Sequence, residues 1–319
     1  FYGCTSLKEV TLPQTILKIE EYAFRDCAFT QFTIPSSATE IQAYAFSYCK
    51  NLTSITLPSG MTKIPNNLFD HCSSLTSIVI PEGVTAIETG AFWECTSLTS
   101  VTIPEGVTSI YGEAFYNCNL LTLSLPNSLE VIGNRAYCNS CSGAYYLGAF
   151  AHNTNLTSVV IPANVSRIGS YAFEGCTSLS QITLQEGLKE IGANAFLDCG
   201  ALRSIIIPEG VTTIEEDAFA NCRLTEISLP RSLKTIGDDG VFQGNKFLTS
   251  VTIYGGVERI GSYAFDGCTS LSQVTLHEGI TTIGKFAFQN CSSLRSITLP
   301  EGVTTIEGGA FYNCDLRDI

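Results

Sequence analysis

Charged residues are scarce in this sequence. They make up 15% of 319 residues, whereas hydrophobic residues make up 45%. A chain this apolar does not stay disordered, so a large ordered core is expected. No apolar run approaches the ~18 residues that a membrane-spanning helix needs. Basic residues are also few, 17 against 30 acidic ones, and the net charge of −13 would repel a nucleic-acid backbone.

Histidine is rare in the sequence, and the motifs typical of enzymes are missing. The three histidines, His71, His152 and His277, fall at unrelated places in the sequence, which disfavours a zinc site. There is no Ser/His/Asp or Cys/His set in a motif context, no glycine-rich phosphate loop and no D-x-D-x-D-G calcium loop. The sequence therefore predicts a protein that is not an enzyme and that holds no metal or cofactor.

What the sequence has instead is one repeat. A phenylalanine recurs every 23 residues, except for one step of 22 and one of 35. These anchor phenylalanines are Phe1, Phe24, Phe46, Phe69, Phe92, Phe115, Phe150, Phe173, Phe196, Phe219, Phe242, Phe265, Phe288 and Phe311. Self-similarity at a fixed period is the signature of a solenoid. We therefore expect residues 1–319 to form a single solenoid of about 13 coils.

The pattern within one coil predicts its local structure. Residues 75–97 read L-x-x-I-x-I-P-x-x-V-x-x-I-x-x-x-A-F-x-x-C-x-x. Apolar and other residues alternate over 77–80, which predicts a short strand, and Pro81 ends it because proline has no N–H. Residues 84–87 predict a second, shorter strand, and the spacing of residues 91–95 suits a single helical turn. The expected fold is a β-rich repeat solenoid with parallel strands.

This pattern resembles the leucine-rich repeats of the BspA-like surface antigens, also called Treponema-type 23-residue repeats. The resemblance covers essentially the whole chain, and both ends stop within a repeat, so a segment of a longer array is expected. The chain begins with Phe1 and shows no signal peptide. The resemblance implies an extracellular, cell-surface solenoid that binds host or matrix proteins such as fibronectin and fibrinogen.

Most of the 14 cysteines follow the repeat. Twelve stand three residues after an anchor phenylalanine, and Asn153 and Asn245 take that place in two coils. Cysteine alternating with asparagine indicates a small, buried side chain that hydrogen-bonds to the backbone. We expect a ladder of reduced thiols rather than disulfides, because parallel Cβ vectors do not suit disulfide geometry.

The step of 35 residues contains an insertion over residues 138–148. Cys138 and Cys141 lie there, outside the ladder, and form a possible local disulfide if the protein is extracellular. Tyrosine among small residues is typical of loops that recognise proteins. The candidate partner-binding residues are Tyr137, Tyr145, Tyr146 and Leu147. The alternative is that these side chains fold back and cover the disturbed coil.

The outward strand positions carry mainly Ser and Thr, which a parallel sheet favours in any case. This face lacks aromatic or arginine anchors of a binding hot spot. The sequence predicts a protein-binding or adhesion module. The alternatives are a passive stalk that presents another domain and an intracellular interaction scaffold.

Overall fold

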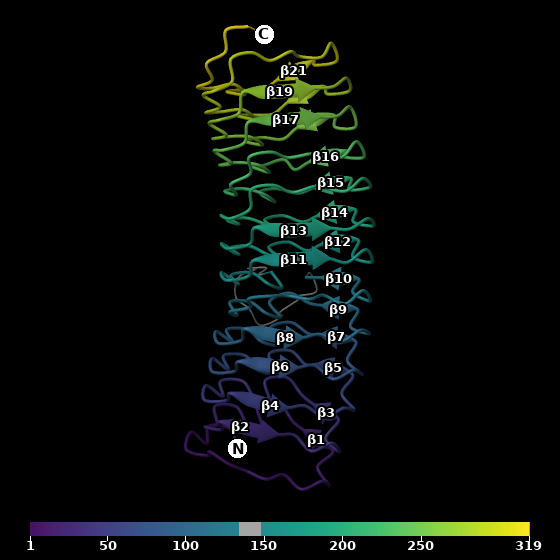
Figure 1. Cartoon of the computed structure of the whole chain (residues 1–319), viewed down its shortest axis with the longest axis vertical. Helices are drawn as coiled ribbons and strands as arrows, with labels where there is room; N and C mark the ends of the chain where they lie inside the picture. Colours follow the sequence, from purple (N-terminus) through teal and green to yellow (C-terminus); the bar gives the residue numbers. More distant parts are fainter. Residues whose placement is uncertain (134–147, 319) are drawn as a thin grey trace. The chain divides into compact units, whose positions relative to one another are not determined.

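Each repeat of the sequence forms one coil of a solenoid with parallel strands (Figure 1). The structure is a computed structural model that describes residues 1–133 and 148–318. Contacts divide the chain into two units, Phe1–Asn164 and Val165–Ile319. The expectation of one uninterrupted solenoid through both units stays a prediction.

Unit 1 places two short strands in most of its coils. The longer strand of a coil precedes the corner proline, and a strand of two residues follows it. The strands are β1 (Lys18–Ile19), β2 (Gln31–Thr33), β3 (Glu40–Ile41), β4 (Ser54–Thr56), β5 (Lys63–Ile64), β6 (Ser77–Val79), β7 (Ala86–Ile87), β8 (Ser100–Thr102), β9 (Ser109–Ile110), β10 (Val131–Ile132) and β11 (Ser158–Ile161).

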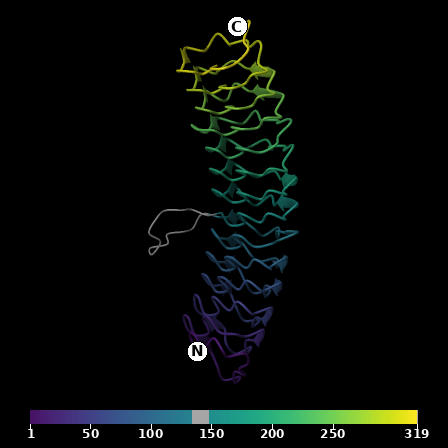
Figure 2. The same ribbon diagram turned by 90° about the vertical axis from the view of Figure 1, so that its left-hand side faces the viewer.

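Unit 2 repeats this arrangement, and Figure 2 shows the coils of each unit edge-on, one above another. Its strands are β12 (Arg167–Ile168), β13 (Gln181–Leu184), β14 (Glu190–Ile191), β15 (Thr213–Ile214), β16 (Thr235–Ile236), β17 (Ser250–Ile253), β18 (Arg259–Ile260), β19 (Gln273–Leu276), β20 (Thr282–Ile283) and β21 (Thr305–Ile306). In the described part of the chain, no helix is long and apolar enough to cross a membrane.

The first and second strands of successive coils differ in how they pair with their neighbours. In unit 1 the second strands form a continuous parallel ladder, β5–β7–β9–β10, with residues of successive coils in register. The first strands pair only two by two, β2 with β4 and β6 with β8. The two-residue strands therefore tie the coils of this unit together more continuously than the longer ones.

The core of each unit is a stack of phenylalanine rings. Neighbouring anchor rings lie 5.0 to 6.0 Å apart in unit 1 and 5.3 to 5.7 Å apart in unit 2, nearly face to face. This spacing is close to that of neighbouring strands, about 4.8 Å, so one ring from each coil fills the space above the last. Phe150 stacks on Phe115 at 5.5 Å and is therefore the anchor of the coil that carries the insertion.

The helical turn expected over residues 91–95 is wrong. Gly90 and Glu94 adopt left-handed φ values of 64° and 57°, which a right-handed helix does not tolerate. The N–H groups also alternate in direction: Trp93 donates to the Gly90 carbonyl of its own coil (3.0 Å), and Phe92 donates to the Ala114 carbonyl of the next (2.8 Å). The segment is a series of tight turns that hydrogen-bond one coil to the next.

Candidate functional site

The cysteine ladder is structural. Ten of its thiols donate to the carbonyl of the anchor phenylalanine one coil earlier, with Sγ···O distances of 3.0 to 3.3 Å. The twelve are thiols rather than disulfides, as expected. Burial raises the pKa of Cys49, Cys222 and Cys268 to about 12. These thiols are protonated at neutral pH and make poor nucleophiles.

The two asparagines of the ladder make the same contact with an amide. The Nδ2 of Asn153 donates to the Phe115 carbonyl at 2.8 Å, and the Nδ2 of Asn245 donates to the Phe219 carbonyl at the same distance. The prediction that this position serves backbone hydrogen bonding is confirmed. Nothing at these positions brings reactive groups together, and no group of three metal-ligating side chains exists within residues 1–133 and 148–318.

The outward face of the first strands carries small polar side chains with a few exposed aliphatic ones. Val79 is 70% exposed and Ile206 is 77% exposed. In unit 1 a shallow groove runs along the unpaired border of β4 and β6, lined by Ile55, Leu57 and Val79 among others. It contains no aromatic ring and a single charged side chain, Glu82.

The residues predicted to bind a partner, Tyr137, Tyr145, Tyr146 and Leu147, lie outside the described residues, as do Cys138 and Cys141. The described chain stops at Gly133, directly after β10, and resumes at Gly148. Gly148 already belongs to the coil, because its carbonyl accepts the N–H of Ala151 at 3.3 Å.

A second candidate site lies on the tight turns. Three positions of each coil shape the turn edge: two residues before the anchor phenylalanine, one after it and two after it. In unit 1 large side chains concentrate there, and we call this set the aromatic edge. It consists of Tyr2, Tyr22, Arg25, Tyr44, Tyr48, His71, Trp93, Tyr116 and His152.

The backbone of this edge is strained where it carries tyrosine. Tyr22, Tyr44 and Tyr48 adopt left-handed φ values of 60°, 58° and 60°. Other coils place asparagine or glycine at the same positions, for example Asn67 and Gly90, and these residues adopt that conformation at lower cost. The same conformation occurs at Tyr171, Tyr263 and Phe286 of unit 2, so it belongs to the turns of the repeat.

The rings and charges of the edge touch from coil to coil. The guanidinium of Arg25 lies 4.5 Å from the ring centre of Tyr48, and the imidazole of His71 stacks on the same ring at 4.4 Å. Tyr22 and Tyr44 stack at 5.1 Å. The edge thus joins three successive coils through side chains as well as through the backbone.

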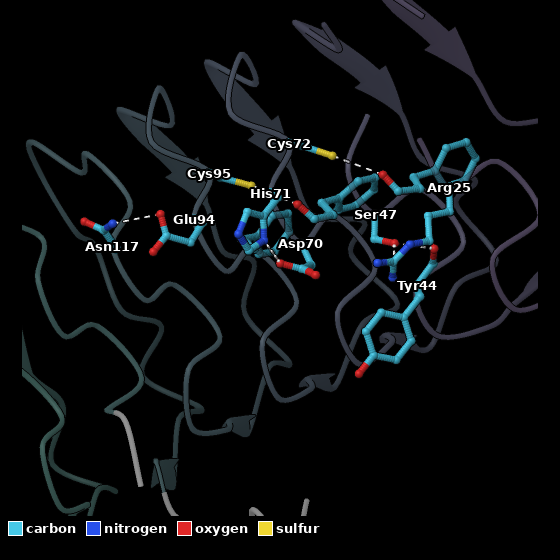
Figure 3. Close-up of polar contacts among 12 residues, drawn as sticks. Arg25, Tyr44, Ser47, Asp70, His71, Cys72, Glu94, Cys95 and Asn117 are labelled. Carbon is cyan, nitrogen blue, oxygen red and sulfur yellow. Dashed lines mark hydrogen bonds and ion pairs between the residues drawn. The ribbon is translucent and has the colours of Figure 1, made fainter. Parts of the chain in front are cut away.

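Polar contacts support the rings, as Figure 3 shows. The Nη1 of Arg25 donates to the hydroxyl of Ser47 (3.3 Å), which donates to the Tyr44 carbonyl (3.0 Å). The nearly buried Asp70 carboxylate contacts the Nδ1 of His71. Burial raises the pKa of Asp70, and the contact with His71 opposes that shift.

Further along the edge, Trp93 meets Tyr116 edge to face at 5.4 Å. Next to Trp93, the Oε2 of Glu94 accepts a hydrogen bond from the Nδ2 of Asn117 at 2.9 Å. Half-buried tyrosine, tryptophan and arginine held by neighbours are the side chains that dominate protein–protein hot spots. The arrangement suits binding of another macromolecule.

Sequence reasoning missed this edge. The signal was available in the sequence. Unit 2 fills most of the same three positions with small or amide side chains, such as Asn194, Asn221 and Gly244, whereas unit 1 carries rings there more often. Unit 2 keeps isolated examples, among them Tyr263 and Phe286, whose rings lie 5.2 Å apart. Aligning the repeats position by position would have shown that unit 1 and unit 2 differ in the side chains of these turns.

Comparison with known families gives one match. Six copies of the model described as "BspA type Leucine rich repeat region" match residues 1–80, 146–239 and 212–319. No curated protein matches the chain.

Several solved structures are similar. A leucine-rich repeat protein from Bacteroides ovatus is 30% identical, with a TM-score of 0.76, over 95% of this chain and 78% of that one. One from Eubacterium ventriosum is 27% identical, with a TM-score of 0.57, over 92% and 78%. A leucine rich cell surface protein from Faecalibacterium prausnitzii is 31% identical, with a TM-score of 0.52, over 88% and 79%.

Proposed function

The chain belongs to the BspA-type leucine-rich repeat family, and from this premise we propose that it is a cell-surface module that binds other proteins. The aromatic edge of unit 1 carries this proposal, because it is the described surface that departs from the repeat toward hot-spot side chains. The Faecalibacterium relative, titled a cell surface protein, supports a location outside the cell. The scaffold is a binding scaffold rather than an enzyme.

The insertion is a second candidate for the binding surface. The described chain stops at Gly133 and resumes at Gly148, which is the first edge position of the Phe150 coil. Tyr145 and Tyr146 of the insertion therefore remain candidate partner-binding residues, together with Tyr137 and Leu147. Matrix or host proteins are the proposed partners, and many weak contacts would gain strength when several copies are displayed on one cell.

The alternative function is a passive stalk. It is favoured by the strand face, whose mainly Ser and Thr side chains offer no anchor for a partner. The aromatic edge favours the binding module, because its tyrosine, arginine and tryptophan side chains contact one another along successive coils of unit 1 and are of the kinds that dominate hot spots.

The test is surface plasmon resonance on immobilised fibronectin and fibrinogen. The edge variant is Tyr44→Asn with Tyr48→Asn, because asparagine occupies the equivalent positions of other coils, as Asn67 and Asn117 show. The expected result is a dissociation constant raised about tenfold or more, since hot-spot aromatics each contribute more than about 1 kcal/mol. The matched control is Tyr171→Asn with Tyr263→Asn on unit 2, which should bind as the unchanged chain does.

A deletion variant distinguishes binding by the insertion from binding by the aromatic edge. Removal of residues 135–147 leaves Ile132-Gly133-Asn134-Gly148-Ala149-Phe150, which has the spacing of Ile191–Phe196. Binding lost only in this deletion would move the site to the insertion. Absence of binding by every version would favour the stalk.

A further inference from the structure

The aromatic edge of unit 1 is more acidic than basic. Its turns carry the acids Glu21, Asp26, Asp70, Glu88 and Glu94 and the bases Arg25 and Lys50. Burial raises the pKa of Tyr48, and the carboxylates of Asp70 and Glu94 raise it further while Arg25 opposes them. With a net charge of −13 on the whole chain, this surface attracts cations.

The edge already holds guanidinium and ammonium groups on its rings. Arg25 lies over Tyr48 at 4.5 Å and over Tyr22 at 5.5 Å, and the Nζ of Lys50 lies 5.8 Å from the Tyr48 ring centre. These distances are within the range in which a cation is attracted to an aromatic face. The chain's own Arg25 thus shows how a partner's arginine can lie on this edge.

Trp93 offers a further aromatic ring on the same edge. Its backbone carbonyl accepts the N–H of His71 at 2.7 Å, which places it beside the coil that carries Asp70. The following residue is the half-buried Glu94. Among the described residues, no arginine or lysine lies over the Trp93 ring.

We propose that Trp93, with the carboxylate of the next residue, Glu94, is the docking point for an arginine of a basic segment of the partner protein. Tryptophan is the best aromatic platform for a cation, and the adjacent carboxylate supplies the opposite charge. Complementary charge of this kind also speeds the encounter with the partner. This inference rests on the proposed protein-binding function and names the chemistry of the partner.

Trp93 also makes the test possible, because it is the only tryptophan in the chain. Its fluorescence is followed while an octa-arginine peptide is added to the full chain. The expected result is a saturable change in emission that weakens as salt is raised. An octa-glutamate peptide should cause no saturable change.

The decisive comparison is between two carboxylates at equivalent positions. Glu94→Gln should raise the dissociation constant about threefold or more, the effect of losing one exposed charge contact near a ring. Asp198→Asn is the matched control on unit 2, where Asp198 stands two residues after Phe196 with φ 59°, and it should change the constant less than twofold. Isothermal titration calorimetry should show that octa-arginine binds the Trp93→Gln variant more weakly than it binds the unchanged chain.

Three outcomes would overturn the proposal. The first is no saturable change with octa-arginine, and the second is an equal loss in Glu94→Gln and Asp198→Asn, which would indicate general charge attraction. The third is unchanged calorimetric affinity in Trp93→Gln. If the edge variants still lost binding to a matrix protein in any of these cases, the protein-binding function would stand and only the arginine chemistry would fall.

Discussion

The Oδ1 of Asn245 accepts a hydrogen bond from the backbone N–H of Leu224, 3.1 Å away in the preceding coil. That coil is one residue short: Pro230 follows Cys222 by eight positions, whereas Pro208 follows Cys199 by nine. A thiol could donate to the Phe219 carbonyl, as Asn245 does, but its sulfur is only a weak acceptor for the N–H of Leu224. Asn153 makes the same bond to Leu120 at 3.1 Å. Asparagine thus follows two of the three coils with this shorter spacing and accepts a buried N–H there, whereas the third, from Cys27 to Pro35, is followed by Cys49.

Replacement of this asparagine by cysteine should therefore destabilise the protein. Asn245→Cys keeps a donor for the Phe219 carbonyl but leaves the Leu224 N–H with only a weak acceptor, which costs about 1–3 kcal/mol of unfolding free energy. Urea denaturation measures the change. Asn51→Ser, at an exposed asparagine, should change the unfolding free energy by less than about 0.5 kcal/mol. Equal stability of Asn245→Cys and the unchanged chain would contradict this reading of the ladder.

The anchor rings should be the most sensitive positions of the core. Phe196 is fully buried and stacks on Phe173 at 5.5 Å and on Phe219 at 5.3 Å. Phe196→Ala should lower the unfolding free energy by about 3–5 kcal/mol. Phe247→Ala, at a phenylalanine that is 52% exposed, should cost less than about 1 kcal/mol. Similar costs at the two positions would argue against a ring-stacked core.

The ladder thiols should resist alkylation in the folded protein. Because burial raises the pKa of Cys49, Cys222 and Cys268 to about 12, they carry no thiolate near neutral pH and are shielded from reagent. Cys4 is exposed and should react with iodoacetamide first. Mass spectrometry of the native chain measures the order of reaction. Modification of Cys222 as fast as Cys4 would show that the ladder opens readily.

The cysteines of the insertion should behave differently if the protein is extracellular. The peptide that contains Cys138 and Cys141 should stay unmodified when the unfolded chain is alkylated without reduction, and it should take up two alkyl groups after reduction. The ladder cysteines serve as the internal control, since they should be alkylated in both cases. Alkylation of Cys138 and Cys141 without reduction would favour the intracellular scaffold.

One ion pair of unit 2 should make stability depend on pH. The Nη1 of Arg259 lies 2.7 Å from the Oε1 of Glu307, and this hydrogen bond holds the pKa of Glu307 below 4.5. A carboxylate with a lowered pKa stabilises the fold above its unfolded pKa, and the contribution is lost as pH falls through the folded value. Thermal unfolding should therefore show Glu307→Gln less stable than the unchanged chain at neutral pH and equal to it well below pH 4.5.

Glu278→Gln, at an exposed carboxylate, is the control for this ion pair. It should unfold at nearly the same temperature as the unchanged chain under both conditions. A stability difference for Glu307→Gln that persisted at acid pH would assign the effect to packing rather than to charge.

The features that recur in every coil could be predicted from the sequence alone. The anchor ring and the thiol recur at a fixed spacing, so their stacking and their backbone hydrogen bonds follow from one coil placed on the next. The helical turn was wrong because spacing alone does not reveal the left-handed φ of Glu94, which depends on hydrogen bonds to the next coil. The contact of Arg25 with Tyr48 joins residues from different coils, so it becomes visible only once the coils are stacked.

The most direct test of the account is a footprint of the bound partner. The chain is treated with hydroxyl radicals alone and in complex with the matrix protein that it binds in surface plasmon resonance, and oxidised side chains are located by mass spectrometry. Tyr22, Tyr48 and Trp93 should be protected in the complex, whereas Tyr263 of unit 2 should be oxidised equally with and without the partner. Protection confined to the strand face, or to residues 134–147, would contradict a binding surface on the aromatic edge.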